Sequence, residues 1–302
     1  NIPYIKHCEE MFETIKHLKS KVIIDIGGND GTLLKTFRRM FNSYKMDSSD
    51  RRFINVDASE TFLKNSLNNG IEFKNAFFNS ELDLPKADII TSTNVFQHTK
   101  NVDSFLKGIA KFLNGVWILE FPYTLTTLST MQFDQFYHEH YYYWLLTPIE
   151  KLFERYNLKI IHISQNNSHG GSMRIWSTNQ ELSSPKVESV IENYKRKEKN
   201  LDLNLFNSNV KNYIKKAKKF ILNLEGKTVF FGAAAKGCVF LNALGINIGN
   251  MPDSYIVDDT LEKIGLFVPG TGFEIVNREK LEKDQIKNII VLAHNFKEYI
   301  KD

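Results

Sequence analysis

Residues 133–144 place two imidazoles, and the carboxylate between them, among many aromatic rings in one short stretch of chain. Its centre reads Tyr137-His138-Glu139-His140. Aromatic surroundings keep water away from a polar group, and a base in such a place can be tuned towards a neutral pKa. The segment therefore indicates general acid–base chemistry, with a packing loop of hydrogen-bonded imidazoles as the alternative. The H-E-x-x-H spacing of a zinc site is absent, so we expect no metal.

A glycine turn follows the first apolar run and reads Asp25-Ile26-Gly27-Gly28-Asn29-Asp30-Gly31. Glycines let the backbone approach a ligand closely, and the start of the next helix offers free N–H groups to a carboxylate. The spacing differs from the G-x-G-x-x-G that holds a dinucleotide pyrophosphate. Acidic residues beside the turn suit a ligand with an ammonium and a sulfonium. The candidate cofactor residues here are Asp25, Gly27, Gly28, Asn29 and Gly31.

Three further candidates stand after the next expected strands. Asp57 ends the second strand, where an acidic side chain commonly accepts both ribose hydroxyls. Phe77 follows the third strand and is a candidate wall for an adenine ring. His98 follows the fourth, at the edge where open α/β sheets bind ligands. A plain strand-to-helix turn with a solvent-exposed Asp57 is the alternative, although the combination with the glycines favours a cofactor site.

Two more glycine-rich segments carry a cation each. His169-Gly170-Gly171-Ser172-Met173-Arg174 suits a phosphate or a sugar hydroxyl, but a simple hairpin turn explains it equally well. Gly232-Ala233-Ala234-Ala235-Lys236-Gly237 directly follows an apolar run, and Lys236 is placed to meet a phosphate. Small residues also serve strand–helix packing, so this second signal is weak when taken alone.

The elements that position these residues alternate as in a doubly wound parallel sheet. We expect helices over 33–41, 59–68, 102–113 and 148–156. A loop rich in turn formers, 166–171, joins two strands of an antiparallel hairpin. Five such strands followed by a hairpin are the layout of the common methyltransferase sheet. The strands expected are 22–26, 53–57, 71–73, 88–92 and 115–120, with 158–164 and 172–177 forming the hairpin.

The second half of the chain changes character. Residues 183–224 are charged and helical, which predicts a connecting helix or helix pair, and a second α/β unit follows with strands at 228–231, 255–258 and 288–293. The expected division is a methyltransferase domain over 1–180, a helical connector over 181–225 and a smaller Rossmann-like domain over 226–302. The last of these ends just after a strand, as a domain that has been cut short would.

Composition and charge narrow the function classes. The net charge is only +4 and the basic residues are scattered, which favours a small anionic ligand over a nucleic acid. Two cysteines, Cys8 and Cys238, cannot form a disulfide framework. No apolar run approaches the roughly 18 residues of a membrane span. We expect a cytoplasmic protein without membrane or nucleic-acid partners, whose first residue, Asn1, is consistent with a piece of a longer chain. The sequence leaves the oligomeric state open.

Taken together, these segments resemble one family, the sugar C-methyltransferases of deoxysugar biosynthesis. They occur in the family's order over nearly the whole chain, and YHEH with GAAAKG is the most specific combination. The family's usual N-terminal zinc domain with four cysteines is not in this sequence, and Gly272 and His294 replace a usual histidine and tryptophan. The matching segments are 25–34 (DIGGNDGTLL), 94–98, 120–123 (EFPY), 133–140 (FDQFYHEH), 169–174 (HGGSMR), 232–237 (GAAAKG), 258–270 (DDTLEKIGLFVPG) and 292–296 (LAHNF).

The resemblance implies S-adenosylmethionine as methyl donor and a nucleotide-activated sugar held between two domains. It also places Tyr137, Glu139 and His140 at the chemistry, with His140 as general base and His98 nearby. On this interpretation the base removes a proton beside a 4-keto group, and Tyr137 or His98 stabilises the enediolate. His169, Arg174 and Lys236 are the expected contacts to the acceptor.

Three alternatives stay open at this point. A sugar O-methyltransferase would use His140 on a hydroxyl, with no ketone required. A non-catalytic binder of sugar nucleotides would have no evident need for the Tyr137, Glu139 and His140 set. An NAD-dependent oxidoreductase would require a pyrophosphate turn, which Gly27–Gly31 fits badly.

Overall fold

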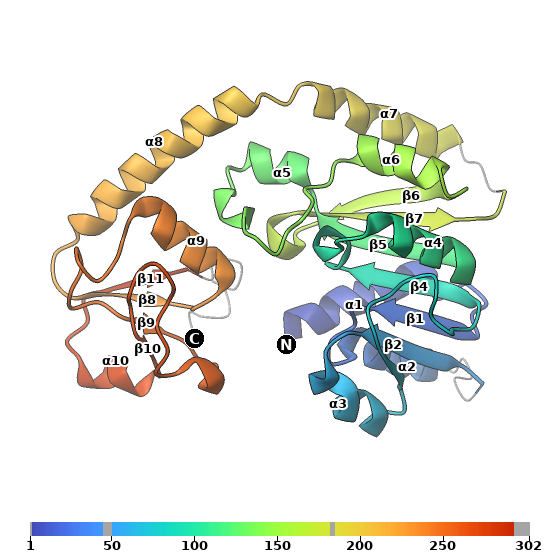
Figure 1. Cartoon of the computed structure of the whole chain (residues 1–302), viewed down its shortest axis with the longest axis horizontal. Helices are drawn as coiled ribbons and strands as arrows, with labels where there is room; N and C mark the ends of the chain where they lie inside the picture. The colour runs from blue at the N-terminus through green and yellow to red at the C-terminus, as the bar shows by residue number, and fades with distance from the viewer. Residues whose placement is uncertain (1, 45–49, 182–184, 293–302) are drawn as a thin grey trace. The chain divides into compact units, whose positions relative to one another are not determined.

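The computed structural model describes residues 2–44, 50–181 and 185–292 (Figure 1). The chain divides into two compact units. The first unit consists of Asn1–Thr124 and Tyr141–Asn200, and the second of Leu125–His140 and Leu201–Asp302. The division expected from the sequence, at residues 180 and 225, does not set the segment Leu125–His140 apart.

A seven-stranded sheet forms the centre of the first unit, in the order β3-β2-β1-β4-β5-β7-β6 (Figure 1). The first five strands run parallel, and β7 is antiparallel to both β5 and β6. This arrangement confirms the expected class I methyltransferase sheet with a hairpin. The strands are β1 (Val22–Ile26), β2 (Arg52–Asp57), β3 (Glu72–Asn75), β4 (Ala87–Thr93), β5 (Leu113–Pro122), β6 (Lys159–Asn166) and β7 (Ser172–Thr178).

Helices cover both faces of this sheet. Successive side chains of β5 point to opposite faces and therefore pack against different helices. Ile118 lies in the core that α1 and α2 form with the sheet, where Phe12 packs on Phe37. Its neighbour Trp117 packs instead against Phe105 of α4 and Phe153 of α6. No expected element corresponds to α1. The helices of this unit are α1 (Ile2–Ile15), α2 (Thr32–Ser43), α3 (Leu63–Asn68), α4 (Val102–Phe112), α6 (Leu146–Glu154) and α7 (Pro185–Lys199).

The second unit has a four-stranded parallel sheet in the order β10-β9-β8-β11. This is one half of a doubly wound fold and confirms the expected smaller Rossmann-like part. The crevice of such a sheet opens between β8 and β11, where the strand order reverses. Its elements are α5 (Thr124–Ser129), α8 (Leu203–Leu222), β8 (Thr228–Phe231), α9 (Ala235–Leu244), β9 (Ile256–Val257), β10 (Ile275–Val276), α10 (Glu279–Lys283) and β11 (Asn288–Val291).

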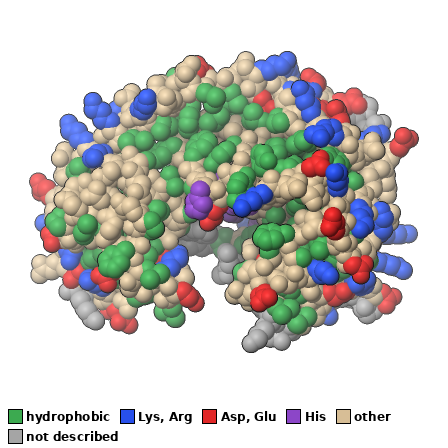
Figure 2. All heavy atoms as spheres, in the orientation of Figure 1, with side chains coloured by type: hydrophobic (Ala, Val, Ile, Leu, Met, Phe, Trp, Pro, Cys, Tyr) green, Lys and Arg blue, Asp and Glu red, His purple; other side chains and the backbone are tan. Residues whose placement is uncertain are grey.

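The connecting region is a helix pair, α7 and α8, and the expected strand at 288–293 ends at Val291 within the described residues. On the face shown in Figure 2, basic side chains lie in several separate areas with acidic ones among them. No helix in the described part of the chain is both long and apolar enough to cross a membrane.

Candidate active site

The turn between β1 and α2 depends on glycine. Gly27 and Gly31 have φ values of 65° and 76°, in the left-handed region that glycine adopts without strain. Gly31 is the N-cap of α2, and the Gly27 N–H donates to the Val56 carbonyl at 2.8 Å. A Cβ on Gly27 would lie 2.4 Å from Val95 Cγ2. The loop is therefore drawn tightly over the ends of the first two strands.

Asp57 fixes this turn from the neighbouring strand. Its Oδ2 accepts the Asn29 N–H at 3.0 Å, and its Oδ1 accepts the Ser59 N–H at 2.8 Å. Each carboxylate oxygen has two lone pairs, so both retain capacity for a further hydrogen bond. Asp57 can thus hold the loop and still accept two hydroxyls of a ligand.

A cavity of about 370 Å³ opens in the first unit where β1, β2 and β4 end. It brings together five of the residues singled out in the sequence: Gly27, Asn29, Asp57, His98 and His169. Asn94 Oδ1 is buried at this cavity without a hydrogen-bond partner among the described residues. An unpaired acceptor beside a carboxylate fits a ligand rich in donors, such as a ribose and an ammonium. The lining is completed by Tyr4, Thr93, Asn94 and Val95.

Asp25 lies beneath the turn and is fully buried. Its Oδ1 accepts from Thr91 Oγ1 at 2.7 Å, whereas a Cβ on Gly28 would approach Oδ2 to 2.6 Å. Burial raises the pKa of Asp25 to about 7, with the charge of Asp57 adding to the rise and the Thr91 hydrogen bond opposing it. This carboxyl supports the turn from below, and its contact with a cofactor stays a prediction.

Phe77 stays a prediction for the adenine wall. Its side chain is 83% exposed, while the next residue, Phe78, is buried against Phe105 and Phe112. Phe77 therefore has a free aromatic face, but the described residues lining the cavity do not include it.

Asn94 and His169 are neighbours in the lining of the same cavity. Both have left-handed backbones, with φ of 57° and 52°, and Asn94 Nδ2 lies 3.2 Å from His169 Nδ1. His169 was predicted as an acceptor contact, and the structure places it beside the glycine turn. Strained backbone at a cavity rim is typical of functional positions.

The YHEH segment lies in the second unit. Tyr137 Oη is 2.9 Å from Nε2 of His140, which is buried, whereas Glu139 is exposed. Four residues before Tyr137, Phe133 stacks on Phe240 of α9 and packs against Tyr213 of α8. The start of the loop is thus packed against the core of this unit, whereas His138 and Glu139 are exposed.

The second unit repeats the arrangement of the first around its own small-residue turn. Asp258 follows β9 as Asp57 ends β2: its Oδ2 accepts the Ala233 N–H at 2.7 Å and its Oδ1 accepts the Thr260 N–H at 2.9 Å. Burial acts to raise the pKa of Asp258, but these hydrogen bonds and Lys263 hold it below its ordinary value. Asp258 is not among the residues predicted for the site, although it directly follows a strand, which is the signal that identified Asp57.

Lys236 stands in the first turn of α9, beside the turn that Asp258 fixes. Burial lowers the pKa of its ammonium, and Asp134 acts in the opposite direction. A partly buried cation at a helix N-terminus is suited to an anion such as a phosphate.

Arg174 is engaged in a buried cluster. It is 5% exposed, and its Nε donates to Glu120 Oε2 at 2.7 Å. His7 of α1 lies 2.9 Å from Glu120 Oε1 and 3.0 Å from Arg174 Nη2. Burial acts to raise the pKa of Glu120, but His7 and Arg174 outweigh it and hold the pKa low. This placement favours a role for Arg174 in docking α1, and acceptor contact stays a prediction.

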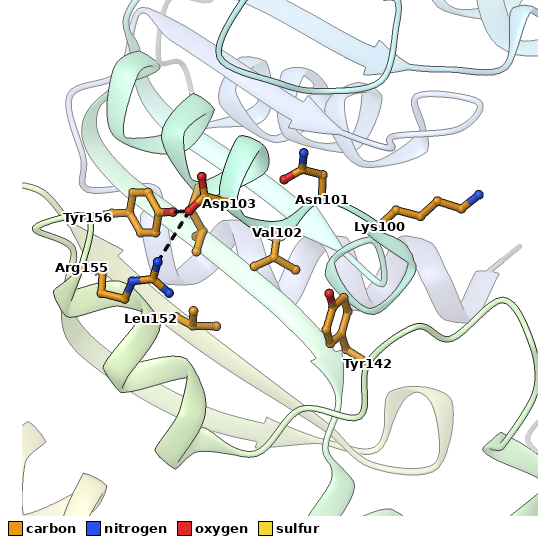
Figure 3. Close-up of a pocket in the computed structure, with 9 residues that line it drawn as sticks. Lys100, Asn101, Val102, Asp103, Tyr142, Leu152, Arg155 and Tyr156 are labelled. Atoms are coloured by element: carbon orange, nitrogen blue, oxygen red, sulfur yellow. Dashed lines mark hydrogen bonds and ion pairs between the residues drawn. The ribbon is translucent and has the colours of Figure 1, made fainter.

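A larger cavity of about 460 Å³ lies in the first unit between α4, α6 and Tyr142 (Figure 3). The Tyr156 hydroxyl donates a hydrogen bond to Asp103 Oδ1, and Arg155 Nη2 lies 3.8 Å from the same oxygen. Dashed lines mark both contacts in Figure 3. The residues of the described chain that line it include none of those predicted to carry chemistry. Nor do the described residues gather three or more His, Cys, Asp or Glu side chains in a place fit for a metal ion.

The sheet order, the glycine turn and the cavity define a class I methyltransferase. Comparisons with known proteins agree: residues 5–163 match the family model described as methyltransferase domain, and residues 167–302 match the C-methyltransferase C-terminal domain. The chain belongs to the methyltransferase-domain family, and the resemblance to the C-methyltransferases is confirmed. It is a methyltransferase dependent on S-adenosylmethionine.

One curated relative is the C-methyltransferase NovU of Streptomyces niveus, 23% identical over 93% of this chain and 68% of its own. Among solved structures, magnesium protoporphyrin IX methyltransferase of Synechocystis with bound S-adenosylhomocysteine has a TM-score of 0.46 at 14% identity, covering 58% of this chain and 83% of its own. The methyltransferase domain of bacterial CtHen1 has a TM-score of 0.44 at 17% identity, covering 58% and 98%.

Proposed function

We propose that this protein methylates a nucleotide-activated sugar at a carbon beside a 4-keto group. The observation that carries the proposal is the hydrogen-bonded Tyr137–His140 pair, which offers a partly dry base. It lies in the same unit as most of the C-methyltransferase C-terminal match. A base is required because the carbon must lose a proton before it can accept a methyl group.

The donor is held by the first unit. The start of α2 at Gly31 meets the carboxylate of the donor, Asp57 accepts its ribose hydroxyls, and Asn94 Oδ1 accepts from its ammonium. S-adenosylmethionine supplies, when bound, a methyl group made electrophilic by a positively charged sulfur. Residues Gly27 and Asn29 shape the backbone against which it lies.

The nucleoside diphosphate of the acceptor is held by the second unit. Lys236 and the N–H groups at the start of α9 meet the diphosphate at the point where β8 ends. Asp258, by its place after β9, meets the ribose of the acceptor. The segment after Leu292, which carries the LAHNF resemblance, lies outside the described residues.

The chain's own residues carry the proton chemistry. His140 removes the proton that the adjacent ketone has acidified. The hydroxyl of Tyr137, or the imidazole of His98, donates to the enediolate oxygen. Holding the carbon in line with the methyl group supplies much of the acceleration. The proton leaves His140 for solvent after transfer, so the base is restored.

A mass-spectrometric assay tests the proposal. The protein is incubated with isotope-labelled methyl donor and matched nucleotide sugars with and without a 4-keto group. We expect label on a carbon of the keto sugar alone. Label on a hydroxyl of the reduced sugar would replace carbon methylation by oxygen methylation. Binding of the sugars without any transfer would make the chain a binder and remove the proposal.

A further inference from the structure

The loop Leu125–His140, which carries Tyr137 and His140, begins and ends in the first unit. We call the two flanking segments, 123–124 and 141–147, the neck of the loop. The chain leaves that unit after Thr124 and re-enters it at Tyr141, so the whole of Leu125–His140 lies between these points. The Thr124 N–H donates to the Trp144 carbonyl at 3.2 Å, and the Tyr123 N–H donates to the Gly171 carbonyl at 3.0 Å. The first of these bonds joins the two ends of the loop to each other, and the second holds Tyr123 to the residue before β7.

A buried carboxylate from α7 binds both sides of this neck. Glu198 is 7% exposed, and its Oε1 accepts the Tyr123 hydroxyl at 2.6 Å and the Leu146 N–H at 2.6 Å. Its Oε2 accepts the Thr147 N–H at 3.0 Å. The donors come from the chain before the loop and from the chain after it, so this one side chain bridges them.

Glu198 also takes the place of a local helix cap. Leu145, the N-cap residue of α6, provides no side-chain hydrogen bond, and the first N–H groups of α6 meet Glu198 instead. A buried charge is costly unless hydrogen bonds surround it, and a helix N-terminus favours a negative one. Tyr123 is completely buried, and burial together with Glu198 raises the pKa of its phenol, so it keeps its proton to donate.

We propose that Glu198 is a positioning residue, which sets the spacing of the two ends of the loop and thereby the place of Tyr137 and His140. It touches no substrate and acts through Tyr123 and the start of α6. The consequence for catalysis rests on the proposed function, whereas the consequence for the order of the loop does not. Misplacement of a catalytic group by 1 Å can cost about 100-fold in rate.

Two variants and a control test this role. Tyr123→Phe removes one hydrogen bond of the neck and leaves the cap of α6 intact. Glu198→Gln keeps the size of the side chain but loses its charge. Lys195→Met serves as the matched control, because Lys195 joins α7 to Glu150 of α6 at 2.8 Å without contacting the neck.

The first readout is hydrogen exchange, which does not depend on activity. In Tyr123→Phe and Glu198→Gln, the loop amides of Gln132, Gln135 and His140 should exchange about ten-fold or more faster, as expected when local order is lost. Amides of β1 and β4 should be unchanged. The Lys195→Met control should resemble the wild type throughout.

The second readout is kinetic. Both neck variants should lower kcat by about ten-fold or more, with donor affinity kept and the effect in Glu198→Gln the larger. Unchanged loop exchange in both variants would overturn the proposal. Faster exchange throughout the first unit would overturn it too, because Glu198 would then serve general stability. Loss of loop protection in a protein whose wild type transfers no methyl group would support the positioning role and refute the proposed function alone.

Discussion

The hydroxyl of Tyr137 lies 2.9 Å from Nε2 of His140, and the two ring centroids are 4.2 Å apart. The nitrogen that would take up a proton therefore already faces a phenol. When the Tyr137 hydroxyl donates to Nε2, that nitrogen carries no proton of its own. That is the form a general base needs.

His140→Gln should keep both ligands bound and lower kcat by roughly 10²- to 10⁴-fold, the usual worth of general acid–base catalysis. Glutamine keeps size and polarity but cannot take up a proton at neutral pH. Wild-type protein with demethylated donor should also exchange the proton beside the ketone with solvent deuterium, and the variant should not. Glu139→Gln, at an exposed position, should have a milder effect. Full activity in His140→Gln would remove His140 as the base.

Asp57→Ala should weaken donor binding by about ten-fold or more, because two charge-assisted hydrogen bonds to the ribose are lost. Calorimetry with S-adenosylhomocysteine measures the affinity directly. Asp83→Ala, at an exposed position in the same unit, is the control and should bind as the wild type does. Equal affinities for all three proteins would place the ribose elsewhere.

Lys236→Ala should raise the acceptor KM by about ten-fold and leave donor affinity alone, because the loss concerns a charge-assisted hydrogen bond to a phosphate. Lys215→Ala removes an exposed cation from α8 of the same unit and should change neither. Steady-state kinetics with the keto sugar and calorimetry with the donor provide the two measurements. A parallel loss of both affinities in Lys236→Ala would show misfolding and not a phosphate contact.

Asp25 should make the stability of the donor-free protein fall with pH. Its folded-state pKa is raised from 3.8 to about 7, so the folded protein binds the proton more tightly than the unfolded chain. The stabilisation is complete below the unfolded pKa and is lost as pH rises through the folded one. Over this window it amounts to roughly 4 kcal/mol at most.

Urea unfolding of wild type and Asp25→Asn at several pH values checks this. Other carboxylates contribute slopes of their own, so the informative quantity is the difference between the two proteins. The wild type should lose stability relative to Asp25→Asn between about pH 4 and pH 7. Two curves that run parallel over this range would show that Asp25 does not titrate there.

The sheet of the first unit could be predicted because each strand is a short apolar run bounded by turn residues. The common position of Asp57 and His98 at the cavity could be predicted for the same reason, since strand ends converge at one edge of such a sheet. Helix α1 was not predicted, because Ile2–Ile15 has no acidic residues in its first turn and no basic residues in its last turn to mark its ends. Tyr4 and His7 lie on this helix and were therefore not predicted either. Tyr4 lines the cavity of about 370 Å³, and His7 lies 2.9 Å from Glu120.

Other parts of the site depend on contacts that sequence patterns do not carry. Arg174 reads as a phosphate contact in isolation, and only the fold shows Glu120 and His7 around it. In the sequence, Glu198 is one of many charged residues in the segment 183–224 that is predicted to be helical. Its partners Tyr123 and Leu146 are 75 and 52 residues away, beyond any helical or strand period.

That separation sets an order of events during folding. A chain that emerges from the ribosome presents Tyr123 and the loop long before Glu198, so the neck closes only after α7 has been made. Until then the phenol of Tyr123 and the first amides of α6 have no carboxylate to meet. Contacts of this range form late because the intervening chain must first lose its freedom. The loop with His140, the proposed base, should therefore reach its final geometry only after α7 has been made, whereas the five parallel strands of the first unit are complete in the chain by Pro122.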